Sequence, residues 1–343
     1  MLIFSITSRP LARATNAVQQ LLAGGKYDGA IWTEGSPRVE ETIYWFNLLI
    51  DTTVPICGNA AQRPHGMISN DGPKNIVDSV DYIASRIWAD EHGRNQAGAV
   101  LSQEQRVFAA RAVQKADARP GGYVATGGHG GILGAAGHDG SPLLHYLPTA
   151  RHTWLSEVKL TLLPAQVTGV RREGSRIETV PVSIKGADGA LLETAIPKVA
   201  ISKDASYWDD DSKGDPEAEV DLVALIGQMS RSAPLAGFVV EGFAPYGRPA
   251  SAARHRLMLR AVYSGLPVVR VGRGNTEGFV PVHDPDFIGG SNLTATKARL
   301  LLMACLMKFG SLPPAADPDH PTPAESAAIR DKIGTYQRVF DTH

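Results

Sequence analysis

The first hundred residues alternate between short apolar runs and longer segments with helical spacing. The runs predict strands at residues 2–7, 27–32, 54–58 and 97–102, and the segments between them predict helices at 12–25, 39–49 and 70–87. In the third helix, Pro73 suits the first turn, and Ile76, Val80, Ile83 and Ile87 recur on one face. This alternation predicts a mostly parallel sheet with helices on both faces.

The second half predicts another unit of the same class. Residues 119–140 are glycine-rich and unsuited to regular helix, and residues 158–184 show a β-type alternation. From residue 196 strands and helices alternate again. We expect four parts: an N-terminal α/β catalytic domain (1–142), an extended β-rich interdomain linker (143–195), a C-terminal α/β domain (196–312), and a Pro-rich tail with a short helix (313–343).

Charge and cysteine content narrow the function classes. The formal net charge is -1 and no dense Lys/Arg run occurs, which argues against a nucleic-acid partner. Cys57 and Cys305 lie in apolar surroundings, so we expect two buried reduced thiols. The apolar run 300–307 is far too short to cross a bilayer, and the first residues do not resemble a signal peptide. We expect a cytoplasmic protein with no membrane association.

One turn between a predicted strand and a predicted helix carries a candidate catalytic group. It is TEGSPRVEET, residues 33–42, and it contains Ser36 followed by Pro37. The carboxyl edge of a parallel sheet, where such a turn lies, is where α/β proteins place their chemistry. Glu40 and Glu41 fall in the first helical turn, where anions suit the helix dipole.

Three motifs in order resemble the bacterial-type L-asparaginase/glutaminase family. They are GSPRVEET (35–42), CGNAAQRP (57–64) and SNDGPKNIVDSV (69–80). Further matches extend the resemblance from about Phe4 to Gly310. It implies an asparaginase-like α/β fold of two domains with parallel-type sheets flanked by helices. It also implies an amidohydrolase without cofactor, working as a dimer of dimers.

The resemblance also implies site residues. The segment AARAVQK places Lys115 at the position of the family's catalytic lysine. In the family this lysine forms a proton-moving triad with a threonine hydroxyl and an aspartate. Here Ser36 and Pro37 replace the Thr-Asp pair. Alternatively, Lys115 is a surface cation that caps a helix. Substrate-binding candidates are the Ser8-Arg9 pair, Gly35, Pro37, Gly58 and Asn59. The backbone N–H groups around Gly35 and from Gly58 to Asn59 are the candidates to stabilise an oxyanion. Tyr246 and Glu277 are candidates to reach across from a neighbouring subunit.

Three departures from the family affect the predicted nucleophile and the predicted substrate. No Gly-Gly-Thr-Ile strand, the family's usual source of the nucleophile, occurs here. Either Met1 is not the biological start, or another chain supplies that strand, or the protein works without it. Pro37 has neither the charge nor the hydrogen-bond donor needed to anchor a substrate's ammonium group, and Arg9 suits a carboxylate.

The remaining polar residues favour structural roles or no role in the chemistry. We expect Arg63 to be structural and Asp71 to cap or brace the helix that follows it. His129 lies in the glycine loop GGHGG, and the other histidines lack the spacing of a zinc site, so we expect no metal.

The sequence therefore predicts an amidohydrolase that releases ammonia from a small amide, which need not be free L-asparagine. Two alternatives stay open. One is a catalytically degenerate protein of the same fold that binds a ligand. The other is one subunit of a two-chain amidohydrolase, with the second chain supplying an N-terminal strand.

Overall fold

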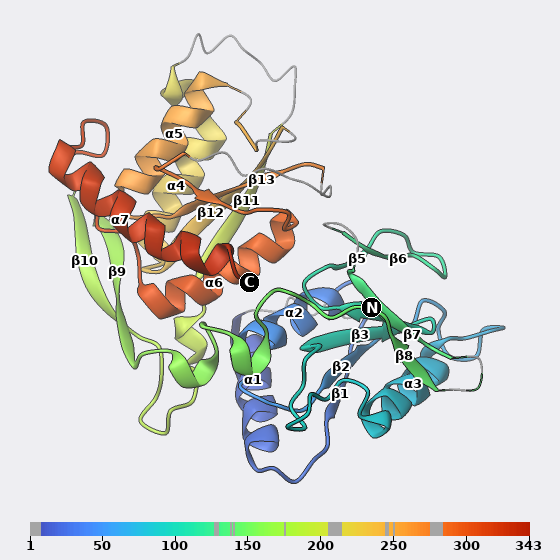
Figure 1. The fold of residues 1–343 in the computed structure, drawn as a ribbon. Helices are drawn as coiled ribbons and strands as arrows, with labels where there is room; N and C mark the ends of the chain where they lie inside the picture. Colours follow the sequence, from blue (N-terminus) through green and yellow to red (C-terminus); the bar gives the residue numbers. More distant parts are fainter. Residues whose placement is uncertain are drawn as a thin grey trace. The chain divides into compact units, whose positions relative to one another are not determined.

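The structure is a computed structural model, and it describes residues 8–126, 130–137, 139, 141–174, 176–204, 215–243, 247–249, 251–274 and 284–343. These residues form two compact units. One unit contains residues 13–161 and His343, and the other contains residues 162–342 and the start of the first helix up to Ala12. Figure 1 shows the elements of each unit. The strand expected at residues 2–7 lies outside the described residues.

The N-terminal unit is built on a six-stranded mixed sheet of order β1-β2-β3-β4-β7-β8. Its parallel half contains β1 (Ala30–Thr33), β2 (Ile56–Asn59) and β3 (Ala99–Gln103), as the alternation predicts. Its antiparallel half contains β4 (Arg106–Ala109), β7 (Ile132–Ala136) and β8 (Pro142–Leu144). A separate hairpin pairs β5 (Val113–Lys115) with β6 (Tyr123–Ala125).

Three helices accompany this sheet: α1 (Ser8–Ala23), α2 (Val39–Leu49) and α3 (Gly72–Ser85). Side chains alternate along a strand, so neighbouring residues of one strand face opposite helices. In β3, Val100 packs in the same cluster as Tyr82 of α3, whereas Leu101 packs in the cluster of Val39 of α2. Helices therefore cover both faces of the sheet, as predicted.

The apolar face of α3 points away from the core. Ile76 is 40% exposed and Val80 is 50% exposed, while Asn75, Asp78, Ser79 and Tyr82 are the buried residues of this helix. Buried polar groups need hydrogen-bond partners, and Asn75 and Ser79 provide them for the carboxyl ends of β2 and β3. The periodicity predicted the helix correctly but did not indicate which face is buried.

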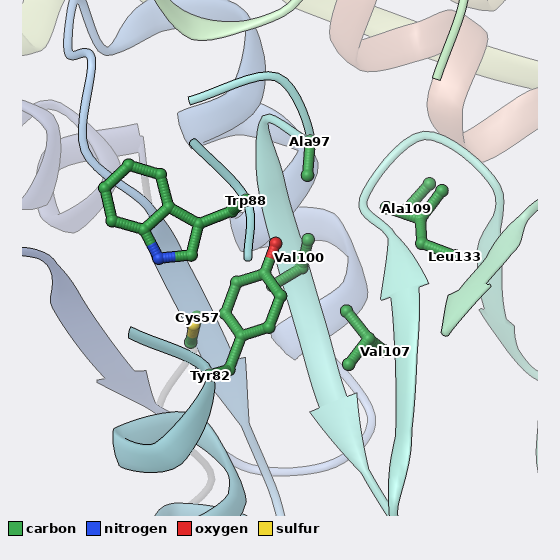
Figure 2. Packing of buried hydrophobic residues seen from close by; sticks show 8 residues of the cluster. All are labelled: Cys57, Tyr82, Trp88, Ala97, Val100, Val107, Ala109 and Leu133. Carbon is green, nitrogen blue, oxygen red and sulfur yellow. The ribbon is translucent and has the colours of Figure 1, made fainter. Parts of the chain in front are cut away.

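The core between α3 and the sheet contains one of the two cysteines. Figure 2 shows Cys57 beside Tyr82, Trp88 and Val100 in this cluster. Both cysteines are buried and they form no disulfide, as predicted. Burial raises the pKa of Cys57 to about 12, so its thiol stays protonated and unreactive near neutral pH.

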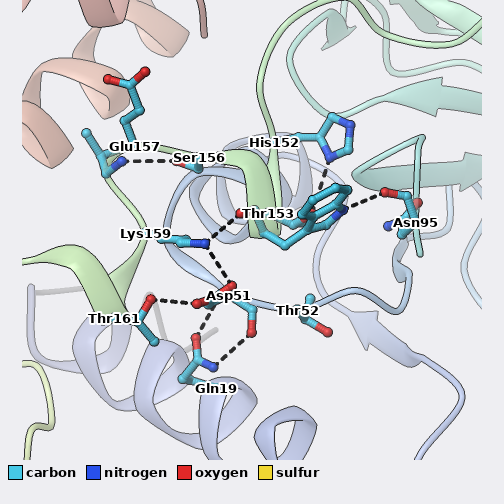
Figure 3. Close-up of polar contacts among 12 residues, drawn as sticks. Gln19, Asp51, Thr52, Asn95, His152, Thr153, Ser156, Glu157, Lys159 and Thr161 are labelled. Atoms are coloured by element: carbon cyan, nitrogen blue, oxygen red, sulfur yellow. Dashed lines mark hydrogen bonds and ion pairs between the residues drawn. The ribbon is translucent and has the colours of Figure 1, made fainter. Parts of the chain in front are cut away.

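A polar network connects α1 and the segment after residue 158 to Asp51, which follows α2. The backbone N–H of Asp51 donates to Gln19 Oε1 at 2.8 Å. The Asp51 carboxylate accepts from Lys159 Nζ at 3.2 Å and from Thr161 Oγ1 at 2.6 Å. Figure 3 shows these contacts converging on Asp51. The predicted linker therefore packs against the N-terminal unit as far as Thr161.

The C-terminal unit has a four-stranded parallel sheet, as predicted. Its order is β11 (Lys198–Lys203), β12 (Ala236–Gly242), β13 (Val268–Gly272) and β14 (Ile288–Gly289). Its helices are α4 (Val220–Ser232), α5 (Ala252–Tyr263), α6 (Ala295–Phe309) and α7 (Pro323–Phe340), and α6 packs on the first three strands. An antiparallel hairpin of β9 (Gln166–Glu173) and β10 (Arg176–Ser183) precedes β11 in the chain.

Helix α7 corrects the expectation of a short helix in the tail, because it spans 18 residues. Thr322 and Glu325 form a capping box at its start, which satisfies two main-chain donors. Ile329, Ile333 and Tyr336 are buried along one side, so packing stabilises its whole length. Short 3-10 turns occur at Thr153–Leu155, Leu160–Leu162, Glu193–Ala195 and Pro216–Ala218. Within the described residues, no helix is long and apolar enough to span a bilayer.

Candidate active site

Ser36 lies in the turn that connects β1 to α2. The N–H of Glu34 donates to the carbonyl oxygen of Asn59 at 3.1 Å, which extends the strand pairing by one residue. The carbonyl oxygen of Gly35 then accepts from Arg38 N at 3.0 Å and from Val39 N at 3.3 Å, which starts the helix. Ser36 is therefore held at the carboxyl end of the parallel strands, half-buried, as the sequence predicts.

Lys115 comes to this turn from the β5–β6 hairpin. Its Nζ donates to Ser36 Oγ at 2.5 Å. Its backbone N–H donates to the Glu40 carboxylate in the first turn of α2, so that carboxylate fixes the strand that carries the lysine. Lys115 is the last residue of β5, and its side chain reaches the turn before α2. The structure brings together the two predicted catalytic side chains.

Tyr123 is a third member of this group, and the sequence analysis missed it. Its hydroxyl donates to the carbonyl oxygen of Ser36 at 2.7 Å, and the residue is 1% exposed. Burial raises its pKa, and the carboxylates of Glu40, Asp71 and Glu104 raise it further. The phenol therefore keeps its proton at neutral pH and donates. A tyrosine in a strand is ordinary, so no sequence signal distinguishes it.

Asn59, predicted to bind substrate, has its side chain committed to the scaffold. Its Nδ2 lies 2.9 Å from Asn75 O, 2.9 Å from Ser79 Oγ and 3.0 Å from Ser102 O, and its Oδ1 accepts from Ser79 Oγ at 3.1 Å. These contacts join the end of β2 to α3 and β3. Asn59 therefore braces the carboxyl edge of the sheet, which leaves its backbone as the part available to a ligand.

The two predicted glycines differ in their surroundings. A Cβ placed on Gly58 would lie 3.2 Å from the side chains of Ile43 and Leu101, so close packing against α2 favours glycine there. Gly35 is exposed, and the nearest atom to such a Cβ would be a side-chain carbon of Pro37 at 3.8 Å. Gly35 and Pro37 are thus both on the open side of the turn.

Asp71 contacts the loop before α3 and also the helix itself, through Asn75, whereas the prediction named only the helix. It is the N-cap residue but its side chain makes no cap hydrogen bond, so the capping option is wrong. Instead its carboxylate accepts from Gln62 N at 3.0 Å, Arg63 N at 2.8 Å, Asn75 Nδ2 at 3.1 Å and Gln103 Nε2 at 2.6 Å. The side chain of Arg63 donates to Ser69 O at 2.5 Å, which agrees with the expected structural role.

Several predicted residues cannot be placed. Tyr246, Glu277 and His129 lie outside the described residues. Ser8 and Arg9 begin α1, but the positions of their side chains are also outside what the structure describes. Their roles stay predictions. Within the described part of the chain, no group of three or more His, Cys, Asp or Glu residues is arranged to hold a metal ion.

A cavity of about 470 Å³ lies near the start of β1, away from the Ser36–Lys115 pair. It is lined by Asp28, Ile31, Val80 and Ile83, among others, and by neither Ser36 nor Lys115. The hydrogen bond between the side chains of Ser36 and Lys115 instead identifies the turn after β1 as the candidate active site.

The chain is similar to known proteins of the asparaginase family. Residues 4–129 match the asparaginase N-terminal domain family. A glutaminase-asparaginase of Acinetobacter glutaminasificans is 32% identical over 111 residues, which is 32% of each chain. The structure also resembles the crystal structure of a probable cytoplasmic L-asparaginase from Campylobacter jejuni, with a TM-score of 0.68 over 99% of this chain and 87% of that one, at 22% identity. Residues 4–129 are thus identified as an asparaginase N-terminal domain, and the chain has an asparaginase-like fold.

The likeness to that structure confirms the predicted asparaginase-like α/β fold. A glutaminase-asparaginase of Pseudomonas fluorescens biotype A aligns over 89% of this chain and 70% of its own length at 24% identity. The alignment with the Acinetobacter relative, by contrast, spans only about a third of that relative's length. All three predicted sequence motifs of this chain fall inside the matched residues 4–129.

Proposed function

We propose that this chain hydrolyses a small amide with release of ammonia, and that Ser36 and Lys115 carry the reaction. The observation that supports this most directly is the 2.5 Å contact between Lys115 Nζ and Ser36 Oγ. A hydroxyl attacks a carbonyl only if its proton has an acceptor nearby, and a lysine within hydrogen-bond reach is such an acceptor once it is unprotonated.

The steps follow from that pair. Ser36 Oγ attacks the amide carbon while unprotonated Lys115 takes the hydroxyl proton. The tetrahedral intermediate collapses, the carbon–nitrogen bond breaks, and the leaving nitrogen takes the proton from Lys115 and departs as ammonia. Water then attacks the acyl–Ser36 ester, which releases the acid and restores the hydroxyl. Backbone N–H groups near Gly35 and Asn59 are the proposed oxyanion donors.

The substrate proposed for this site lacks an α-ammonium group. Pro37 is exposed beside Ser36, and it offers neither a carboxylate nor an N–H to such a group. The nearby carboxylates are engaged: Glu34 accepts from Trp32 Nε1 at 3.0 Å and pairs with Arg38 at 3.6 Å, and Glu40 accepts from the Lys115 backbone. Neutral or anionic small amides therefore fit better than free L-asparagine. Arg9 is the proposed partner for a substrate carboxylate.

The assembly proposed is a homo-oligomeric dimer of dimers in the cytoplasm, with Tyr246 and Glu277 completing a neighbouring subunit's site. This rests on the family, and the Campylobacter jejuni protein is itself named a probable cytoplasmic L-asparaginase. A two-chain enzyme is a second candidate, because among the described strands β1 is at the sheet edge and pairs only with β2. A strand from another chain could pair there.

Ammonia release from purified protein tests the proposal. The panel contains L-asparagine, L-glutamine, their D forms, simple primary amides and cyclic imides, with Lys115→Met compared with wild type. Loss of general-base catalysis lowers kcat by about 10²–10⁴. Lys198→Met, which removes an exposed lysine of β11, is the control and should keep wild-type activity. Equal ammonia release from Lys115→Met and wild type would refute the role of this pair. No release by wild type would favour the ligand-binding or two-chain alternatives.

A further inference from the structure

We propose that Tyr123 is a positioning residue, whose hydroxyl holds Ser36 in the orientation that reaction with Lys115 requires. This inference rests on the proposed function of Ser36 and Lys115. It adds a residue that the sequence did not predict to be in the site, and it assigns separate roles to the tyrosine hydroxyl and to its ring.

Ser36 is held at two atoms by one pair of facing residues. Lys115 and Tyr123 lie directly opposite each other in the antiparallel β5–β6 hairpin. Lys115 Nζ contacts the Ser36 hydroxyl at 2.5 Å, and Tyr123 OH donates to the Ser36 carbonyl oxygen at 2.7 Å. A shift of the hairpin would therefore move Lys115 Nζ and Tyr123 OH together, so the two groups keep a constant position relative to each other.

The turn itself gives the Ser36 carbonyl little other support. The hydrogen bonds between main-chain groups that close the turn use the carbonyl oxygen of Gly35, which accepts from Arg38 and Val39. The peptide after Ser36 joins Pro37, so it has no N–H with which to fix its plane. The Tyr123 hydroxyl donates to the Ser36 carbonyl oxygen from the side of the hairpin, and this contact fixes the peptide plane.

The tyrosine ring is rigidly placed, so its hydroxyl has a defined direction. Tyr123 packs in an apolar cluster with Val39, Leu101, Phe108 and Val113, which come from α2, β3, β4 and β5. Its pKa is raised by burial and by nearby carboxylates, so the phenol stays a donor near neutral pH. It contacts the main chain of Ser36 and not its Oγ, and its role is therefore orientation and not proton transfer.

Tyr123→Phe removes the hydroxyl and keeps the ring, so packing is preserved. A displacement of about 1 Å at a reacting atom can cost about 10² in rate. We expect kcat to fall by about tenfold to a hundredfold while KM stays within about twofold, because the substrate contacts are untouched. The control is Tyr82→Phe, the same change at a buried tyrosine whose hydroxyl has no hydrogen-bond partner among the described residues. It should keep wild-type kcat.

A second measurement does not depend on knowing the substrate. Phenylmethylsulfonyl fluoride sulfonylates activated serines, and intact-mass and peptide spectrometry give the rate at Ser36. We expect labelling of wild type and Tyr82→Phe at one rate, and of Tyr123→Phe at least about tenfold more slowly. If Lys115→Met is labelled slowly but Tyr123→Phe is labelled at the wild-type rate, the inference about Tyr123 is overturned and the proposed function is not. Labelling of Lys115→Met at the wild-type rate, or none of Ser36 in wild type, would overturn the proposed function and this inference with it.

Discussion

The substitution Asp71→Asn tests whether the carboxylate beside the candidate site holds the loop before α3. Asp71 accepts hydrogen bonds from the main chain of Gln62 and Arg63 and from the side chains of Asn75 and Gln103. A hydrogen bond to a charged group contributes about 1.5–3 kcal/mol, against about 0.5–1.5 kcal/mol for a neutral one. Asparagine keeps the size of the side chain, loses the charge, and replaces one acceptor oxygen with a donor.

The expected loss follows from these contacts. Four donors that each lose about 1 kcal/mol would give about 4 kcal/mol, and partial exposure of the carboxylate reduces this to about 3 kcal/mol. For a unit of this size, 1 kcal/mol corresponds to about 2–4 °C in Tm, so the transition of the N-terminal unit should fall by roughly 6–12 °C. The control Asp81→Asn removes the same charge from the same helix and should change stability by less than about 0.5 kcal/mol.

The pH dependence gives the sharper test. Burial raises the pKa of Asp71, but N–H donors from Gln62, Arg63 and Asn75 outweigh it, so the folded-state pKa lies below the ordinary value. The stability from this carboxylate is therefore complete above its unfolded pKa of about 3.9 and is lost as pH falls through the folded pKa. Urea unfolding from pH 3 to 8 should show a constant gap between wild type and Asp71→Asn at neutral pH that narrows below about pH 4. A gap that stays constant down to pH 3 would refute this argument.

Two further predictions concern other contacts of the fold. Asn59→Ala should destabilise the protein by roughly 3 kcal/mol in urea unfolding, because it removes the donor that satisfies the buried carbonyl groups of Asn75 and Ser102. A change below about 1 kcal/mol would contradict the bracing role of Asn59. Thr322→Ala should cost about 1 kcal/mol through loss of the α7 capping box, and Thr322→Ser should restore most of it, as measured by thermal unfolding. Equal stability of the two Thr322 variants would count against the cap.

The parallel strands and the long helices were predictable because each has a strong local pattern. Helix α2 begins at Val39 and ends at Leu49, the bounds that its apolar spacing predicts. The antiparallel strands β4, β7 and β8 were not predicted. They have 3–5 residues each, and β7 and β8 lie in or beside the glycine-rich stretch. The pairing of all three strands therefore depends on contacts with β3 and on one another more than on local pattern.

The candidate site was predictable to the extent that it depends on motifs. Ser36 and Lys115 are 79 positions apart, and no periodicity relates them; their family motifs placed both in one site, and the structure brings them within 2.5 Å. Tyr123 was not found, since its role comes from facing Lys115 across a hairpin. The loop between β5 and β6 decides that register, and the sequence of neither strand specifies it alone.

Helix α3 shows why hydrophobic pattern and burial separate near a functional edge. Strands β2 and β3 end in Asn59 and Gln103, both fully buried and polar, and only polar partners can satisfy such groups. The helix next to them therefore turns Asn75 and Ser79 inward, and its apolar Ile76 and Val80 remain exposed. Since exposing an aliphatic side chain costs about 1.5–3 kcal/mol and orphaning a buried polar group costs a similar amount, several polar groups together outweigh two apolar ones. A helix that packs its polar face on the sheet and exposes its apolar face therefore indicates that the sheet edge beneath it is polar, as active-site edges of α/β proteins are.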